Sequence, residues 1–143
     1  GSSLIELRQP TFIHDSGLGS LDDDVKFDYV VAQSIFSHTA PDLLERWVAD
    51  VSTRLAHDGV FFATVIEGDV ECDDVGWIYP ECVEYRLDTV SELATKYGLT
   101  FATLTWYHPR QTWCALYAPG FNSKLLNEGL PSWNSFGTLR KEF

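Results

Sequence analysis

The chain has 143 residues, with 10 Lys and Arg against 21 Asp and Glu, which gives a formal net charge of −11. This length corresponds to one ordinary domain. The 45% share of hydrophobic residues and the 22% share of charged residues exclude global disorder. Nucleic-acid binding by phosphate neutralisation needs clustered Lys and Arg, so we expect no nucleic-acid partner. The apolar stretches are far shorter than about 20 residues, so we expect no membrane span.

The beginning of the chain indicates an excised or processed product. The sequence contains no methionine, and Gly1–Ser3 are typical of residues left by cloning or cleavage. We therefore expect a domain over 4–118 that need not be complete. It is followed by a tail over 119–143 that we expect to pack on the domain through Phe121, Leu125, Leu126, Trp133 and Phe136.

The cysteines favour a reducing, cytoplasmic setting. Cys72, Cys82 and Cys114 are odd in number and show no metal-ligand spacing. We therefore expect idle or buried thiols and no metal site.

The first half of the chain combines short strands with one helix. Thr11–His14 is rich in β-forming residues and predicts a strand. Phe27–Ala32 is apolar nearly throughout, as expected of a parallel strand covered on both faces. Apolar residues at helical spacing then predict a helix that starts at Pro41 and is stopped by Gly59 at its C′ position. Val60–Ile66 is a second strongly apolar strand.

The second half adds a helix and a hairpin. A loop over Glu67–Leu87 precedes a helix that is capped at position 88 or 89 and ended by Gly98. Leu99–Tyr107 and Thr112–Ala118 are β-rich runs joined by a turn, which predicts an antiparallel hairpin. The whole order predicts a three-layer α/β sheet, mostly parallel, with right-handed crossovers and a C-terminal antiparallel hairpin.

Three blocks of the sequence together resemble a known family. They are "FDYVVAQSIFSH" (Phe27–His38), "LLERWVADVSTRLAHDGVFFATV" (Leu43–Val65) and the helix and hairpin over 85–118. In this order they resemble the C-terminal portion of a class I S-adenosylmethionine-dependent methyltransferase, from its fourth strand to its last two strands. The resemblance covers Thr11 to Ala118 and implies an incomplete Rossmann-like sheet.

The family's first strand, its glycine-rich turn and the acidic residue of its second strand are not visible here. Phe12–Leu21 superficially resembles that turn, but no crossover helix fits before Phe27. The resemblance therefore implies that this chain alone binds S-adenosylmethionine weakly or not at all. It also implies that the strand Phe27–Ala32 lacks a neighbour. Such an open edge predicts a homodimer, or association with a missing N-terminal half.

Three residues are candidates for cofactor binding by resemblance. Asp15 would stand at the end of the family's third strand and accept a hydrogen bond from the adenine amino group. The alternative is an ordinary turn aspartate. Gln33 and Ser34 follow a strand's carboxyl end, where open α/β sheets bind ligands, beside the methionine part of the cofactor. The alternative is that they satisfy a turn.

The candidates on the substrate side depend on the same resemblance. His38 could contact or deprotonate a methyl acceptor, or simply help to start the helix. Trp77 and Tyr79 lie in the loop where this family often builds its acceptor pocket, and they could stack on a substrate or pack over a core edge. His108 and Arg110 stand at a hairpin tip, where solvation is the simpler expectation.

Three functions remain open from the sequence. The first is methyl transfer from S-adenosylmethionine to an unidentified acceptor, small-molecule or otherwise, in the intact protein. The second is a non-catalytic, methyltransferase-like module whose task is association. The third is a different nucleotide-binding α/β domain, for example one for a sugar nucleotide, which the terminal antiparallel hairpin disfavours.

Overall fold

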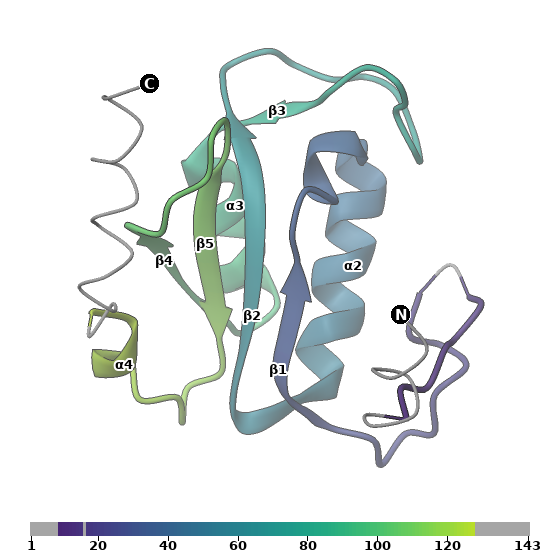
Figure 1. Cartoon of the computed structure of the whole chain (residues 1–143), viewed down its shortest axis with the longest axis vertical. Helices are drawn as coiled ribbons and strands as arrows, with labels where there is room; N and C mark the ends of the chain where they lie inside the picture. The colour runs from purple at the N-terminus through teal and green to yellow at the C-terminus, as the bar shows by residue number, and fades with distance from the viewer. Residues whose placement is uncertain (1–8, 16, 128–143) are drawn as a thin grey trace.

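The computed structural model describes residues 9–15 and 17–127 of the chain. Its elements alternate strands and helices along most of this length (Figure 1). In chain order they are β1 (Phe27–Ala32), the 3-10 turn η1 (Phe36–His38), α2 (Pro41–Arg54), β2 (Leu55–Glu67), β3 (Glu84–Tyr85), α3 (Leu87–Lys96), β4 (Thr100–Leu104), β5 (Thr112–Tyr117) and α4 (Lys124–Asn127).

The strands form one open, mixed sheet in the order β1-β2-β5-β4. β1 pairs with β2 in parallel, and β3 forms a short parallel pair with the end of β2. β5 runs antiparallel to both β2 and β4. The predicted α/β sheet with a C-terminal antiparallel hairpin is therefore confirmed, with β1 at one edge of the described sheet.

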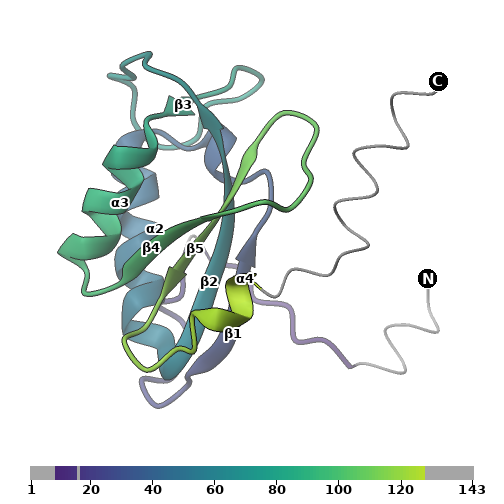
Figure 2. The same ribbon diagram turned by 90° about the vertical axis from the view of Figure 1, so that its left-hand side faces the viewer.

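Both long helices cover the same face of the sheet (Figure 2). The connections β1-α2-β2 and β2-α3-β4 advance across the sheet in the same direction. Right-handed crossovers that advance in one direction place their helices on one face. The described residues thus form two main layers in place of the predicted three, and the short α4 is their only helix on the opposite face.

The core has a large helix-facing part and a smaller part on the other face. The first joins sheet residues such as Phe61 and Leu116 to Leu44 and Val48 of α2 and Val90 of α3, all at most 1% exposed. The second is aromatic and centres on Val60, Leu104 and Ala115, with Phe62, Trp106, Trp113, Tyr117 and Phe121 packed against them. The ring centroids of Phe62 and Trp106 are 4.9 Å apart.

Two predicted features of the first half are wrong. Thr11–His14 forms no strand and is exposed, because β propensity alone does not hold a strand that has no partner strand. Gly59 does not end a helix, since α2 ends at Arg54 and β2 already begins at Leu55. Inside β2, a Cβ on Gly59 would lie 2.7 Å from the carbonyl oxygen of Phe27. Close approach of two strands therefore accounts for this glycine.

The second helix differs from prediction at its start and agrees at its end. α3 begins at Leu87 with Arg86 as N-cap, and no side chain caps it, so the predicted capping at position 88 or 89 is wrong. The extended backbone of Arg86 emerges from β3 and turns directly into the helix. At the other end, Gly98 adopts a φ of +73°, as expected of a C-terminal glycine.

The tail packs on the domain only in part. The Phe121 ring lies 5.4 Å from that of Tyr117, and Leu126 joins the same apolar cluster. Leu125 is 53% exposed, so its predicted packing is wrong. It stands in α4, a helix of four residues, which is too short to turn both adjacent leucines toward the sheet. Trp133 and Phe136, also predicted to pack, lie outside the described residues.

Candidate functional site

Five polar residues meet where the parallel strands β1 and β2 end. Ser34 and Ser37 follow β1, and Thr64 lies near the end of β2. The antiparallel β5 starts beside the end of β2, so the β4–β5 connection brings His108 and Gln111 to the same edge. We call these five residues the polar cluster. Open α/β sheets bind ligands at the carboxyl ends of their parallel strands.

The backbone of Ser34 adopts a conformation that side chains disfavour. Its φ is +56°, in the left-handed region where few residues other than glycine are found. The Ser34 N–H donates a hydrogen bond of 2.7 Å to Oγ1 of Thr64, which is fully buried. Backbone strain of this kind persists where neighbours hold it, and it gathers at functional sites.

The side chains of the polar cluster are joined by long hydrogen bonds. Oγ of Ser34 lies 3.4 Å from Nε2 of His108 and 3.4 Å from Nε2 of Gln111. The Gln111 amide also reaches Oγ of Ser37 at 3.3 Å. Its other end, Oε1, is buried and has no hydrogen-bond partner among the described residues. A buried amide oxygen of this kind can accept an N–H or O–H from a ligand or a water.

His108 is held by its own turn. Its Nδ1 accepts the backbone N–H groups of Gln111, at 3.0 Å, and of Arg110, at 3.3 Å. Burial, and to a smaller extent the positive charge of Arg110, lower the pKa of the imidazole below its usual value. Both effects favour the neutral ring. His108 thus belongs to the polar cluster, whereas the sequence predicted a solvated hairpin tip.

Only part of this cluster is marked by local sequence patterns. Ser34 was a predicted binding residue, and Gln33 beside it is exposed. Ser37, Thr64 and Gln111 were not singled out. The predicted hairpin alone did not reveal them. The observed strand order does, because an antiparallel strand next to β2 must begin where β2 ends.

Asp15 lies in a loop and not at the end of a strand. Its side chain is exposed, and Oδ2 accepts the backbone N–H of Ser20 at 3.0 Å. The strand that was to place this carboxylate near a cofactor does not form. The contact with Ser20 matches the turn aspartate that the sequence left as the alternative.

His38 ties two distant segments together. Its Nδ1 lies 2.9 Å from the carbonyl oxygen of Glu81 and 3.2 Å from that of Ile78. Both partners are acceptors, so Nδ1 carries the proton and donates. The Tyr79 ring lies beside the imidazole, with ring centroids 5.5 Å apart and planes inclined by 60°. Tyr79 is 81% exposed and Trp77 is 57% exposed. The acid–base role of His38 and the substrate stacking of the two aromatic residues stay predictions.

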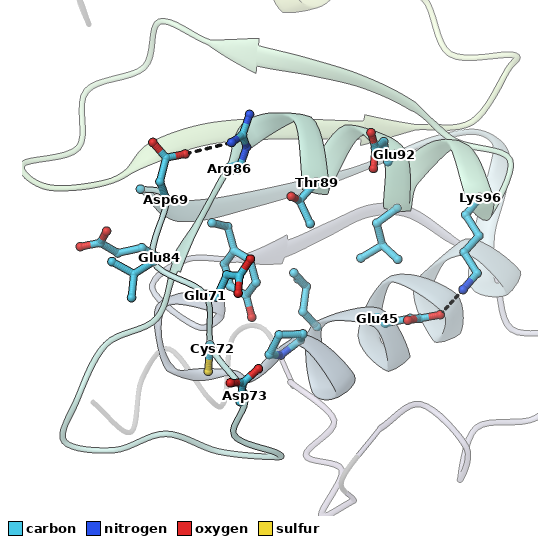
Figure 3. A pocket seen from close by; sticks show the side chains of 16 residues that line it. Glu45, Asp69, Glu71, Cys72, Asp73, Glu84, Arg86, Thr89, Glu92 and Lys96 are labelled. Carbon is cyan, nitrogen blue, oxygen red and sulfur yellow. Dashed lines mark hydrogen bonds and ion pairs between the residues drawn. The ribbon is translucent and has the colours of Figure 1, made fainter.

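A separate cavity of about 530 Å³ lies between α2, α3 and the loop after β2 (Figure 3). Its cations are paired with carboxylates, Arg86 with Asp69 at 3.4 Å and Lys96 with Glu45 at 2.5 Å. The hydrogen bond from Lys96 lowers the pKa of Glu45, and the same bond raises the pKa of Lys96. The cavity shares no lining residue with the polar cluster or with the predicted site residues.

The remaining candidate features of the described part of the chain are metal ligands, thiols and apolar helices. No group of three or more His, Cys, Asp or Glu residues there could hold a metal ion. The three cysteines are unpaired. None of the described helices combines the length and the apolar character that crossing a membrane requires.

The comparisons with known proteins agree with the fold. No protein-family model and no curated protein matches the sequence, whereas 127 chains of solved structures do match. Magnesium protoporphyrin IX methyltransferase from Synechocystis PCC 6803, with bound S-adenosylhomocysteine, has a TM-score of 0.57 at 10% identity. The match covers 82% of this chain and 57% of that one.

Two further structures give the same picture. Burkholderia thailandensis 1,6-didemethyltoxoflavin-N1-methyltransferase, with bound substrate and S-adenosylhomocysteine, has a TM-score of 0.53 at 18% identity and covers 71% of this chain. The pyocyanin biosynthetic protein PhzM has a TM-score of 0.60 at 11% identity and covers 82%. The chain spans 48% and 37% of their lengths. At these identities the likeness establishes the fold, which is part of a class I S-adenosylmethionine-dependent methyltransferase fold, as the resemblance implied.

Proposed function

We propose that this chain forms the C-terminal part of an S-adenosylmethionine-dependent methyltransferase domain, and that its polar cluster lines the ligand site. The observation that carries the proposal is the position of the cluster. Ser34, Gln111 and His108 meet at the carboxyl ends of β1 and β2, on the fold of a methyltransferase. This is the edge at which such a sheet binds its ligand.

The residues present fit the methionine end of such a cofactor. Ser34 is only partly buried and offers its hydroxyl group, and Oε1 of Gln111 is a buried acceptor without a donor among the described residues. A ligand with both an ammonium and a carboxylate group satisfies acceptors and donors together. When bound, S-adenosylmethionine supplies an electrophilic methyl group. The residues of this chain would bind the cofactor and orient it toward the methyl acceptor. Holding two reactants in this way lowers the barrier of their reaction.

The proposal also assigns roles to the other residues that the sequence singled out. Gln33 is exposed beside Ser34 and can reach the same ligand. Asp15 would have to contact adenine from its loop. Trp77 and Tyr79 lie in the loop after β2, and His38 is hydrogen-bonded to the same loop. In this proposal all three would meet the methyl acceptor. The acceptor itself is not identified by their chemistry.

A titration of the chain with S-adenosylhomocysteine tests the proposal. We expect binding weaker than micromolar by calorimetry, because the glycine-rich turn is not among the described elements. In amide NMR spectra at millimolar ligand, the shifted resonances should be those of residues 33–37 and 108–112. Shifts confined to the cavity between α2 and α3, or no shifts at all, would contradict the proposed site. Micromolar affinity would contradict the need for a further part of the domain.

An association module is the second candidate function, and the edge strand favours it. β1 has a single strand partner in the described sheet. Tyr29 and Val31 are 68% and 63% exposed on the face away from the helices. Open strand edges pair readily with other chains. We propose that this edge takes up a second copy of the chain or the complementary part of the domain. A protein without cofactor binding but with stable association would fit this candidate alone.

A further inference from the structure

We propose that His108 and Gln111 are positioning residues, which orient the Ser34 hydroxyl so that it donates to a carboxylate oxygen of the bound ligand. This inference rests on the proposed function and specifies how the polar cluster holds the cofactor's amino-acid end. It assigns a task to the β4–β5 connection, which is distant in sequence from Ser34. The direction of each hydrogen bond in the cluster follows from which atoms carry a hydrogen.

The tautomer of His108 follows from its turn. Two backbone N–H groups point at Nδ1, from Gln111 and Arg110, so this atom must carry a lone pair. A neutral imidazole then has its proton on Nε2. Nε2 lies 3.4 Å from Oγ of Ser34, so the histidine donates and the serine accepts.

Gln111 supplies the second donor. Its Nε2 lies 3.4 Å from Oγ of Ser34, which has two lone pairs and one hydrogen. With both lone pairs facing N–H groups, the Ser34 hydroxyl hydrogen is left to donate elsewhere. These bonds are long, and such bonds often tighten only when the ligand is bound.

The backbone keeps the serine in place for this task. The Ser34 N–H is bonded to Thr64 Oγ1 at 2.7 Å, and the φ of +56° sets the direction of its side chain. The hydroxyl therefore has few other orientations, and its preferred ligand group is a pure acceptor. A carboxylate is the strongest acceptor in a cofactor that also carries an amino group.

The ligand-free protein already offers one test. In long-range ¹H–¹⁵N spectra of the imidazole, His108 should show the neutral tautomer with its proton on Nε2. A proton on Nδ1 would remove the donor to Ser34 and overturn the inference, whatever ligand the protein binds.

Two substitutions of His108 separate positioning from structural support. In His108→Asn the Oδ1 atom replaces Nδ1 and keeps an acceptor for the turn, but the donor to Ser34 is lost. In His108→Gln the amide nitrogen replaces Nε2 and keeps the donor, but the acceptor for the turn is lost. A positioning role predicts that Gln preserves ligand binding and Asn does not. A purely structural role predicts the reverse.

A further experiment compares two ligands by NMR titration. It measures the affinity of S-adenosylhomocysteine and that of 5′-methylthioadenosine, which lacks the amino-acid part. The wild type and His108→Gln should prefer S-adenosylhomocysteine by at least about tenfold, because the hydrogen bond from Ser34 to its carboxylate alone is worth about that factor. His108→Asn and Ser34→Ala should each reduce this preference by about tenfold. An unchanged preference in His108→Asn would overturn the inference and leave the proposed function intact. Absence of shifts with both nucleosides in the wild type would contradict the proposed function, and with it this inference.

Discussion

The hydroxyl of Tyr85 donates a hydrogen bond of 2.5 Å to the carbonyl oxygen of Thr39, and both residues are buried. The bond joins the end of the loop after β2 to the residue before the N-cap of α2. Backbone hydrogen bonds between 37–40 and 76–83 extend the same contact. The two segments that follow the parallel strands are therefore fixed to each other, and they frame one side of the polar cluster.

Replacing Tyr85 by Phe should destabilise the fold by about 1–2 kcal/mol, because the carbonyl oxygen of Thr39 would be left buried without its donor. Urea unfolding at neutral pH measures this change. Tyr79→Phe is the matched control. The Tyr79 side chain is 81% exposed, so this substitution should leave the free energy of unfolding almost unchanged. Equal stability of the two variants would show that the Tyr85 bond contributes nothing.

The same tyrosine predicts a loss of stability at high pH. Burial raises the pKa of Tyr85 from 10.0 to about 12. A raised folded-state pKa means that the stabilisation is complete below pH 10 and declines as the pH rises toward 12. Tyr85→Phe lacks this titration, so the wild type should lose about 2–3 kcal/mol relative to the variant over that interval. If the free energies of unfolding of the two proteins changed equally with pH over this interval, the prediction would be contradicted.

Gly59 should not tolerate alanine. The added Cβ would lie 2.7 Å from the carbonyl oxygen of Phe27 and 3.0 Å from the backbone nitrogen of Ala56. Both neighbours are backbone atoms of paired strand segments, so we expect a loss of about 1–3 kcal/mol. Gly19→Ala is the control, because nothing lies within 4 Å of its Cβ position. The midpoints of thermal unfolding compare the two variants, and similar midpoints would count against the close approach of β1 and β2.

Gly59 also shows what local pattern can and cannot predict. The long strands, the two long helices and the hairpin follow from apolar periodicity, so their existence was predictable. The two-residue β3 lies inside the predicted loop Glu67–Leu87 and has no such signal. The end of α2 was not, because the chain turns straight into β2 at Leu55 and no turn residue marks that point. The strand predicted over Thr11–His14 was wrong for a related reason. A strand needs a neighbouring strand to pair with, and the local sequence does not show whether one is present.

The polar cluster was predictable only from topology. Ser34 could be found by its position after β1, within one local pattern. His108 and Gln111 come from a turn more than 70 residues away, and their role depends on β5 lying beside β2. A hairpin tip is usually solvated, and only the order of strands in the sheet places this one beside the carboxyl ends of β1 and β2.

The three thiols should differ widely in reactivity. Cys114 is fully buried, and burial raises its pKa to about 12, so almost no thiolate forms at neutral pH. Cys82 is exposed, and Cys72 is half-buried. Iodoacetamide should therefore modify Cys82 first and Cys114 only after unfolding, as measured by peptide mass spectrometry. Labelling of Cys114 at the rate of Cys82 in the native protein would contradict its burial.

The open edge of β1 should control association. Val31 is 63% exposed on the edge strand, and lysine at such a position disfavours pairing with another strand. We expect the wild type to be dimeric in light scattering, and Val31→Lys to weaken the dimer by at least about tenfold. Val75→Lys carries the same charge change at a loop position that is 77% exposed, and it should remain dimeric. Circular dichroism of the variants excludes loss of the fold as the cause. A monomeric wild type would refute this role of the edge, whereas dissociation of both variants would assign the effect to net charge.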